Sequence, residues 1–443
     1  MYSDKIQKYQ KKMELVDNNN IDKKNLYQRK LDYYNGLHEP VCQKDKSKQK
    51  NEMTNNNFDY NKLTDDINLL LKPIIYSQEK YELNIDTPDA IKAVGYGTLH
   101  KDFPLVKMIF DRRTPKDNDV VIEILYCGVC HSDWHVIKNE WKNSKYPVIV
   151  GHEITGQVLK VGKNVTKFKV GDYVAVGPNY NSCRRCCQCD NGFEQYCLND
   201  TTEVYNMPDR RDGELKPTGP ITYGGYSNII VVNEYYVLSL PEGTKLDKIA
   251  PVLCAGATMY TPLKYMNIKK GSRVGIAGIG GLGHIGIKLA KALGAEVVAI
   301  TRTPDKLSDA KRLGSDESLL VTDMDSLKPY HNWFDLIIDT IPFNHDLMPY
   351  IDLIAPQGTL WIIGSFFSMA TDFNLVNRSG RIIRGSSIAG IADTQEIINL
   401  CVENNIYPEI IPIKIQDLNN THHNIINSKV RYRYVVDMST IYQ

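Results

Sequence analysis

Five of the ten cysteines in this 443-residue chain fall within one stretch of fifteen residues. Four of them follow a C-x2-C-x2-C-x7-C pattern: Cys183, Cys186, Cys189 and Cys197. Four thiolates at this spacing can close a tetrahedral zinc site, and a site with every position filled by protein is structural. The pattern therefore predicts a structural zinc site. Cys187 falls outside the spacing and is interpreted as a spare thiol.

A glycine-rich loop stands between patterns typical of a strand and of a helix. Its glycines are Gly278, Gly280, Gly281 and Gly283. The first permits a tight turn, the second lets a pyrophosphate approach the backbone, and the third lets the helix pack on the strand. The helix N-terminus attracts the phosphates. Such loops also form for packing alone, but the strand pattern at 273–278 and the helix pattern at 282–293 favour a dinucleotide site.

The end of the next expected strand, at 296–301, bears on which dinucleotide binds. A site specific for NAD usually carries an acidic residue there, which binds the ribose 2′-hydroxyl. Here Thr301 holds that place, and Arg302, Thr303 and Lys306 follow. The missing acid and the nearby cations favour the 2′-phosphate of NADP(H) over NAD(H). The alternative is that Arg302 and Lys306 merely face solvent.

Apolar runs between helical patterns organise the second half of the chain. The runs at 296–301, 334–339 and 358–363 have the length and composition of buried parallel strands. We therefore expect an α/β domain with a doubly wound parallel sheet over residues 241–385. The preceding part, residues 89–240, is punctuated by Gly and Pro and predicts a β-rich domain with a strand at 120–126.

The two ends of the chain complete this organisation. Residues 386–443 predict a helix near 394–404 and a strand at 433–437. Residues 1–88 are rich in Lys, Asn, Asp and Gln and contain a single glycine, Gly36. Short apolar clusters could form a helix there but could hardly bury a core, so we expect a low-complexity extension that is largely disordered or loosely helical. A solvated tail is favoured over a binding module.

Composition excludes several classes of function. The formal net charge of +1 provides no basic field for nucleic acid. No run of eighteen or more apolar residues exists, which argues against a membrane-spanning helix. The first twenty residues lack the apolar core of a secretory signal, so we expect a cytoplasmic protein. In that compartment cysteines are metal ligands or free thiols before they are disulfides.

Cys130, His152 and Cys254 form a dispersed set whose spacing carries no meaning alone, because a lone Cys or His is usually an ordinary core residue. The motifs around them do. The segments 127–133, 151–165, 253–258 and 430–437 resemble the zinc-containing medium-chain alcohol dehydrogenases, in particular the cinnamyl alcohol dehydrogenase and aldehyde reductase branch. The likeness extends over about residues 89–443 and leaves out the N-terminal extension.

The resemblance implies a second metal site. Cys130, His152 and Cys254 would bind a catalytic zinc ion and leave its fourth position open, an arrangement for which alcohol dehydrogenase is itself the known example. Glu153 would lie behind the metal, and Asp133 would orient His152.

The resemblance also implies a route for protons and a fold. Ser132 and His135 would relay a proton between substrate and solvent, and Thr258 would contact the cofactor. The fold would join a GroES-like β-rich catalytic domain, to which the C-terminal segment returns, to a Rossmann cofactor domain. Family habit adds a homodimer.

The expected chemistry follows from these parts. Two zinc ions per chain and NADP(H) would support hydride transfer between an alcohol and its aldehyde, with zinc as a Lewis acid. Trp134, Trp141, Phe366 and Phe367 could line an apolar pocket for an aromatic or medium-chain aldehyde, or be ordinary packing residues. Two alternatives are a zinc-free quinone reductase of the same fold and an inactive member that binds NADP or a partner through its extension. The first lacks the ligands found here, and the second needs no proton relay.

Overall fold

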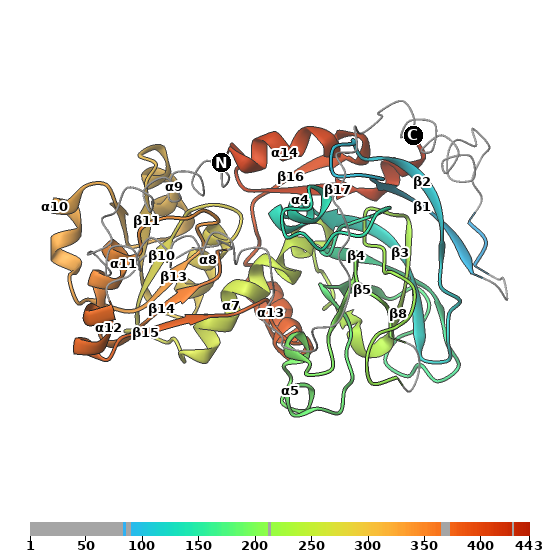
Figure 1. Ribbon diagram of the computed structural model, residues 1–443, viewed down its shortest axis with the longest axis horizontal. Coiled ribbons are helices and arrows are strands. Elements are labelled where there is room, and N and C mark those ends of the chain that lie inside the picture. The colour runs from blue at the N-terminus through green and yellow to red at the C-terminus, as the bar shows by residue number, and fades with distance from the viewer. Residues whose placement is uncertain (1–82, 86–89, 211–213, 365–372, 428) are drawn as a thin grey trace, which may run out of the picture. The chain divides into compact units, whose positions relative to one another are not determined.

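The computed structural model of the chain describes residues 83–85, 90–210, 214–364, 373–427 and 429–443 (Figure 1). These residues belong to one compact unit that runs to the C-terminus. The expected extension up to residue 82, together with Phe366 and Phe367, lies outside the described residues. Within the described ranges no helix has the length and apolar character that a membrane crossing requires.

Six parallel strands form the sheet of the cofactor half, drawn in yellow and orange in Figure 1. They are β10 (Arg273–Ala277), β11 (Glu296–Thr301), β12 (Glu317–Leu320), β13 (Phe334–Asp339), β14 (Ile354–Ile362) and β15 (Ile382–Gly385). The sheet order is β12-β11-β10-β13-β14-β15, so the chain starts in the middle and winds outward in both directions. This is the Rossmann order, and the point of reversal lies between β10 and β13.

Both faces of this sheet are buried, which explains the continuous apolar runs of its strands. Along β11, Val297 and Ala299 join one core cluster, whereas Val298 and Ile300 join another on the opposite face. The first cluster is completed by helices α7 (Ala255–Tyr265), α8 (Gly283–Ala292) and α13 (Ile391–Glu403). The second is completed mainly by α11 (Met348–Leu353). Around the sheet also lie α9 (Asp305–Leu313), α10 (Met324–Leu327) and α12 (Phe373–Ser379).

A second sheet, of seven strands, dominates the other half of the unit. Its order is β16-β17-β3-β4-β5-β9, and β8 also pairs with β3. The strands are β3 (Asp119–Gly128), β4 (Ile154–Val161), β5 (Tyr173–Val176), β8 (Ile229–Asn233), β9 (Leu238–Ser239), β16 (Ile410–Lys414) and β17 (Arg433–Asp437). The C-terminal β17 pairs antiparallel with β3, so the last segment of the chain returns to this sheet (Figure 1).

Shorter elements surround the second sheet. They are the hairpin β1 (Ile91–Gly97) and β2 (Val106–Arg112), the pair β6 (Asn179–Asn181) and β7 (Thr202–Glu203), and helices α4 (His131–Ile137), α5 (Cys187–Asp190), α6 (Leu246–Ile249) and α14 (Leu418–Ile426). Leu83 and Ile85, which precede the expected domain boundary at residue 88, pack against a cluster built on Ile91 and Val121. The domain limits 89–240, 241–385 and 386–443 stay predictions.

Candidate active site and metal centres

The dispersed candidates come together at the N-terminal end of α4. The ligand atoms of Cys130, His152, Glu153 and Cys254 all lie within 4.8 Å of one another. Cys130 is the N-cap of α4, and Cys254 directly precedes α7. His152 and Glu153 directly precede β4. The Sγ atoms of Cys130 and Cys254 are 4.0 Å apart. All four residues are buried, so folding alone assembles the set.

Asp133 holds this cluster in place. Its buried carboxylate accepts hydrogen bonds from the Cys130 N–H at 3.0 Å and the Gly151 N–H at 3.1 Å. It also accepts from the Tyr226 hydroxyl at 2.8 Å and contacts His152 Nδ1 at 3.0 Å. The Tyr205 hydroxyl lies 3.0 Å from the same Nδ1. Because Nδ1 is engaged, Nε2 is the nitrogen that His152 can offer to a metal.

Glu153 is fully buried and forms an ion pair with Arg433, the first residue of β17. Burial raises the pKa of Glu153 to about 7, although Arg433 acts in the opposite direction. Oε1 lies 3.9 Å from His152 Nε2, and Oε2 has no hydrogen-bond partner. The carboxylate therefore stands among the ligands rather than apart from them and is a candidate fourth ligand.

The donor set fits a zinc ion. Hydrogen bonding to Cys254 lowers the pKa of the Cys130 thiol, and His152 and Arg433 lower it further. The same contact raises the pKa of Cys254, so Cys130 is the thiol of the pair that loses its proton more readily. Two thiol ligands and one imidazole are the borderline-soft donors that zinc prefers.

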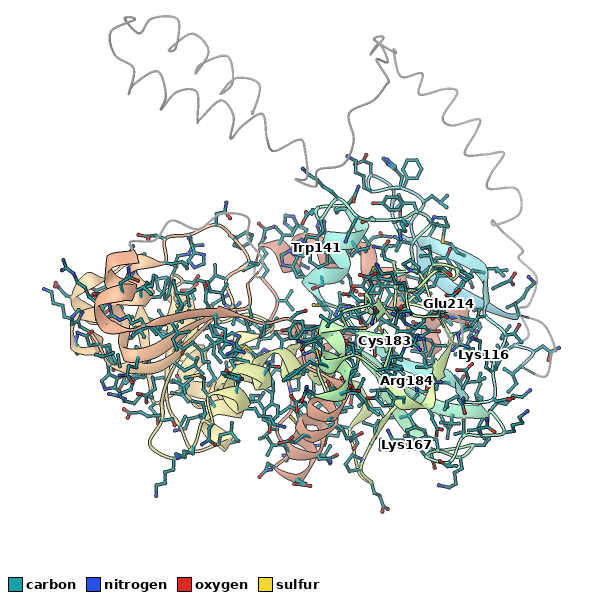
Figure 2. All side chains as sticks on the ribbon, turned by 60° about the horizontal axis from the view of Figure 1, so that its bottom comes forward. Lys116, Trp141, Lys167, Cys183, Arg184 and Glu214 are labelled. Carbon is teal, nitrogen blue, oxygen red and sulfur yellow. The ribbon has the colours of Figure 1, made fainter. Side chains whose placement is uncertain are left out.

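The Cys-rich segment forms a second cluster. The Sγ atoms of Cys183, Cys186, Cys189 and Cys197 lie within 4.8 Å of one another, and that of Cys189 is 3.5 Å from that of Cys186. Cys187 is exposed and stands outside the cluster. Figure 2 shows Cys183 beside Arg184 and apart from Trp141, which lines the cleft described below. Four thiol donors without an open position fit a structural zinc ion.

The segment that carries these cysteines, residues 183–197, is called the cysteine lobe here. It contacts the segment that leads into α13. The buried Glu194 accepts hydrogen bonds from the Ile391 N–H at 3.1 Å and the Tyr235 hydroxyl at 2.6 Å. A side chain at Gly390 would meet the Gly192 carbonyl oxygen at 1.8 Å. The lobe thus packs directly against the chain where it leaves the Rossmann sheet.

A cleft with an empty volume of about 1440 Å³, open solvent included, connects the first cluster to the glycine loop. Cys130, Ser132 and His135 line one end. The loop glycines Gly278, Gly280 and Gly281 and the cations near β11 line the rest. A dinucleotide in this cleft could reach from the glycine loop to the cysteine–histidine cluster.

The expected proton-relay residues lie side by side on α4. Ser132 Oγ is 3.7 Å from Cys130 Sγ, so its hydroxyl stands next to the metal ligands. The His135 ring stacks between His131 and Trp141, with centroid distances of 4.4 and 4.9 Å. Glu140 contacts His135 Nδ1 at 2.5 Å. This stack and this contact fix the orientation of the imidazole.

The glycine loop has the geometry that its sequence predicts. Gly278 has a φ of +87°, which favours glycine. A Cβ on Gly283 would lie 1.9 Å from the Gly278 carbonyl oxygen, whereas one on Gly280 would meet nothing within 4 Å. Gly283 therefore serves packing of α8, and Gly280 leaves room in the cleft.

The residues expected to select the cofactor gather at the end of β11. Thr301, Arg302, Thr303 and Lys306 all line the cleft. Lys306 is only 7% exposed, and neither it nor Arg302 forms an ion pair within the described part of the chain. Burial lowers the pKa of Lys306, as does the nearby Arg431. Asp309 acts in the opposite direction, but the pKa stays lowered, so a bound anion would help to offset the cost of burying this cation.

Some residues lie at positions in the structure that the sequence did not predict. Thr258 is buried on α7 and is not among the cleft-lining residues. Trp134 packs in the core against His422, whereas Trp141 lines the cleft. Arg433 also lines the cleft and would lie 3.0 Å from a Cβ on Gly281, a role that only its place in a family-like segment could have suggested.

Comparison with known proteins agrees with this geometry. The profile of the alcohol dehydrogenase GroES-like domain matches residues 116–242, and that of the zinc-binding dehydrogenases matches residues 281–403. A probable zinc-type alcohol dehydrogenase-like protein of Acanthamoeba polyphaga mimivirus is 43% identical over 353 residues, which cover 80% of this chain and 83% of that protein. The chain belongs to the zinc-containing alcohol dehydrogenase family, in its cinnamyl alcohol dehydrogenase branch.

Solved structures of this branch share the fold. A cinnamyl alcohol dehydrogenase from Sorghum bicolor superposes with a TM-score of 0.75 at 36% identity, over 79% of this chain and 98% of that one. The Helicobacter pylori enzyme titled CAD, complexed with NADP(H), gives a TM-score of 0.72 at 39% identity, with the same coverage. As a member of this family, the chain is an oxidoreductase of alcohols and aldehydes.

Proposed function

We propose that this dehydrogenase binds two zinc ions per chain and uses NADP(H) to reduce aromatic or medium-chain aldehydes. The observation that carries the proposal is one cleft that holds Arg302 and Lys306 at one end and a Cys–His–Cys ligand set near the other. The assignment of roles to single residues belongs to the same proposal. Family habit adds a homodimer, and the composition of the first twenty residues adds a cytoplasmic location.

The chain would hold the two zinc ions in different ways. The four-cysteine cluster of the lobe is closed and serves stability. In the cleft Cys130, His152 and Cys254 bind the ion, Asp133 fixes the His152 ring, and Glu153 stands close enough to join them. Zinc at this place supplies Lewis acidity to the substrate oxygen, while the nicotinamide supplies or accepts hydride.

Proton transfer is the task of the chain itself. Ser132 Oγ stands beside the ligand cluster and can donate to, or accept from, an oxygen of the substrate. His135 lines the same cleft with Nδ1 engaged by Glu140, which leaves Nε2 for proton exchange. No direct hydrogen bond joins Ser132 and His135 within the described residues, so a hydroxyl or water in the cleft completes the path.

Charge supports NADP(H) over NAD(H). The guanidinium of Arg302 can grip a 2′-phosphate with two parallel hydrogen bonds, and Lys306 adds a buried point charge. Position 301 holds a threonine and not an acidic residue, so no negative charge at this position repels the 2′-phosphate. The related H. pylori structure titled as an NADP(H) complex supports this choice.

The substrate class rests on the apolar side chains near the zinc end of the cleft. Trp141, Ile425, Val430 and Tyr434 line the cleft, whereas Tyr432, which also lines it, stacks on His284 beside the glycine loop. Such walls favour a flat or extended apolar aldehyde over a small polar one. The sorghum relative named for cinnamyl alcohol is consistent with an aromatic substrate.

The test is kcat/KM with NADPH and NADH and a panel of aldehydes. Arg302→Ala should lower kcat/KM for NADPH roughly ten- to a hundredfold and leave NADH little changed, since hydrogen bonds to charged groups are among the stronger ones. Thr301→Asp should go further by repelling the phosphate while offering the ribose hydroxyl an acceptor. A wild type that prefers NADH, or an Arg302→Ala variant that loses both cofactors equally, would refute the cofactor assignment.

A further inference from the structure

His345 lies beneath the cofactor cleft without being one of its lining residues. Its side chain is 8% exposed and belongs to the loop between β13 and α11. Nε2 lies 3.0 Å from Oδ2 of Asp339, and Nδ1 lies 2.7 Å from the Phe343 carbonyl oxygen. The ring also packs edge to face on Tyr350, with centroids 5.7 Å apart.

Both ring nitrogens of His345 therefore face oxygen acceptors. A carbonyl oxygen can only accept, so Nδ1 carries a proton. In the fully buried Asp339 carboxylate, Oδ2 is the ion-pair partner of Nε2, and Oδ1 accepts a hydrogen bond from the Ile341 N–H at 3.0 Å. A buried carboxylate is stable only when paired, so the imidazolium form of His345 suits this place.

The segment held by this pair forms a wall of the cleft. Thr340, Ile341, Pro342 and Phe343 all line it. Thr340 Oγ1 donates to the carbonyl oxygens of Ala277 and Gly278, at 2.9 and 3.0 Å, so the wall is fastened to the glycine loop itself. A Cβ on Gly278 would lie 2.6 Å from that hydroxyl, which shows how closely the two segments pack.

We propose that His345 is a positioning residue for the dinucleotide, and that its ion pair with Asp339 holds the Thr340–Phe343 wall in the shape that binds the cofactor. This deepens the proposed function, because it rests on the cleft being a dinucleotide site. The pair acts only while the imidazole is protonated, so cofactor affinity depends on pH.

The groups that face His345 define the sign of that dependence. They are Asp339 on β13, Arg302 after β11 and the ring of Tyr350 on α11, on which the neighbouring Asp346 also acts. Burial lowers the pKa of His345, but the contacts with Asp339 and the Phe343 carbonyl outweigh burial and leave the pKa raised. The contribution is complete below the ordinary value of about 6.5 and is lost as pH rises through the raised pKa.

The experiment measures the Kd of NADPH between about pH 7 and 9, a range in which the 2′-phosphate is ionised because its second pKa lies near 6. Wild-type affinity should fall as pH rises. His345→Gln should bind roughly three- to tenfold more weakly near pH 7, the loss of one or two hydrogen bonds, and the two curves should converge at high pH. Lys306 titrates in both proteins, so the difference between the curves isolates His345. The kcat at saturating cofactor should change little.

His331 offers a matched control. It forms an ion pair with Asp352 at 2.8 Å, is half exposed, and lies outside the cleft lining, so His331→Gln should leave the Kd unchanged at every pH. Proton uptake on NADPH binding, measured by calorimetry in two buffers, tests the wild type without any substitution. Asp339→Asn provides a second variant if His345→Gln fails to fold.

Two results separate the inference from the proposed function. If wild type binds NADPH but shows no proton uptake, or if the curves of wild type and His345→Gln run parallel, His345 is not a positioning residue. If wild type binds neither NADPH nor NADH, the proposed function itself fails.

Discussion

At the scale of single residues, Asp133 holds more groups of the site together than any of the proposed zinc ligands does. Its two oxygens contact the backbone of Cys130 and Gly151, the Tyr226 hydroxyl and the His152 ring. These four groups come from three separate parts of the chain, because Gly151 and His152 are neighbours, and three of the groups belong to or adjoin the proposed zinc ligands. The carboxylate thus couples the fold of the β-rich half to the orientation of His152.

Asp133→Asn tests this coupling. An amide must turn an N–H toward one of four groups that are donors, which leaves at least one buried donor unpaired. The free energy of unfolding should fall by about 2–4 kcal/mol, and turnover should fall with it because His152 loses its fixed orientation. The measurements are chemical denaturation and kcat.

Tyr226→Phe is the matched variant, since it removes one donor and leaves the carboxylate intact. It should lower the free energy of unfolding by only about 1 kcal/mol and preserve most of the activity. Equal effects of the two substitutions would show that Asp133 is an ordinary buried residue.

Sequence reasoning found residues only where a pattern pointed to them. The four lobe cysteines were predicted from spacing alone, because all four ligands lie in one short segment. The set of Cys130, His152 and Cys254 needed the family resemblance, since its members are brought together only by the fold. Tyr205 and Arg433 were given no role, because a buried tyrosine or arginine has no local pattern that reveals its partner.

At the scale of elements, the loop between β10 and α8 separates two reasons for a glycine. Gly283 is demanded by packing, because a Cβ would overlap the Gly278 carbonyl oxygen. Gly280 is not demanded by the fold, because a Cβ there would meet nothing within 4 Å. The lack of a side chain at Gly280 therefore matters only for a molecule that enters the cleft.

Gly280→Ala should therefore impair cofactor binding, whereas Gly283→Ala should lower stability. Gly280→Ala should keep the melting temperature of wild type and weaken NADPH binding at least tenfold, by placing a methyl group where the pyrophosphate approaches the backbone. Gly283→Ala should lower the melting temperature in the absence of cofactor. Thermal unfolding and cofactor titration distinguish them, and an unchanged NADPH affinity in Gly280→Ala would place the phosphates elsewhere.

The cysteine lobe allows an equally sharp comparison. Cys186→Ser should remove one zinc ion per chain and lower the melting temperature, because that ion stabilises the fold. Cys187→Ser, its exposed neighbour, should change neither. Cys130→Ser should abolish turnover while much of the fold survives. Metal analysis of fresh wild-type protein that finds one zinc ion or none would contradict the assignment.

Buried strands were the elements best predicted from sequence. β11 and β13 have the expected limits, because strands covered on both faces are continuous apolar runs. β14 begins at Ile354, four residues before the expected start at Gly358, and its pairing with β13 shifts register between these two positions, so the apolar run predicted only the regular part of the strand. β16 (Ile410–Lys414) was not predicted, because Pro412 interrupts a short apolar run none of whose residues is buried.

At the scale of the whole molecule, the boundary of the catalytic body can be tested directly. The proposed residues all follow Ala90, and Leu83 and Ile85 pack against the β-rich half. A chain that starts at Leu83 should therefore keep the kcat/KM of the full chain. One that starts at Ala90 should retain the chemistry but unfold at a lower temperature, because it loses that packing. Loss of activity in the chain from Leu83 would assign a catalytic or assembly role to the extension.

The contact between the cysteine lobe and the start of α13 has a mechanical consequence. Glu194 and Gly192 contact Ile391 and Gly390, at the joint where the chain passes from the Rossmann sheet to α13. If the four cysteines of the lobe bind zinc as proposed, the ion would hold the lobe's side of this contact in place and so stabilise the joint between the two halves. Chelation of the zinc ion proposed for this lobe should weaken that contact. The melting temperature should fall, as in Cys186→Ser, and KM for the cofactor should rise with it, so an ion far from the substrate would also affect how the cofactor binds.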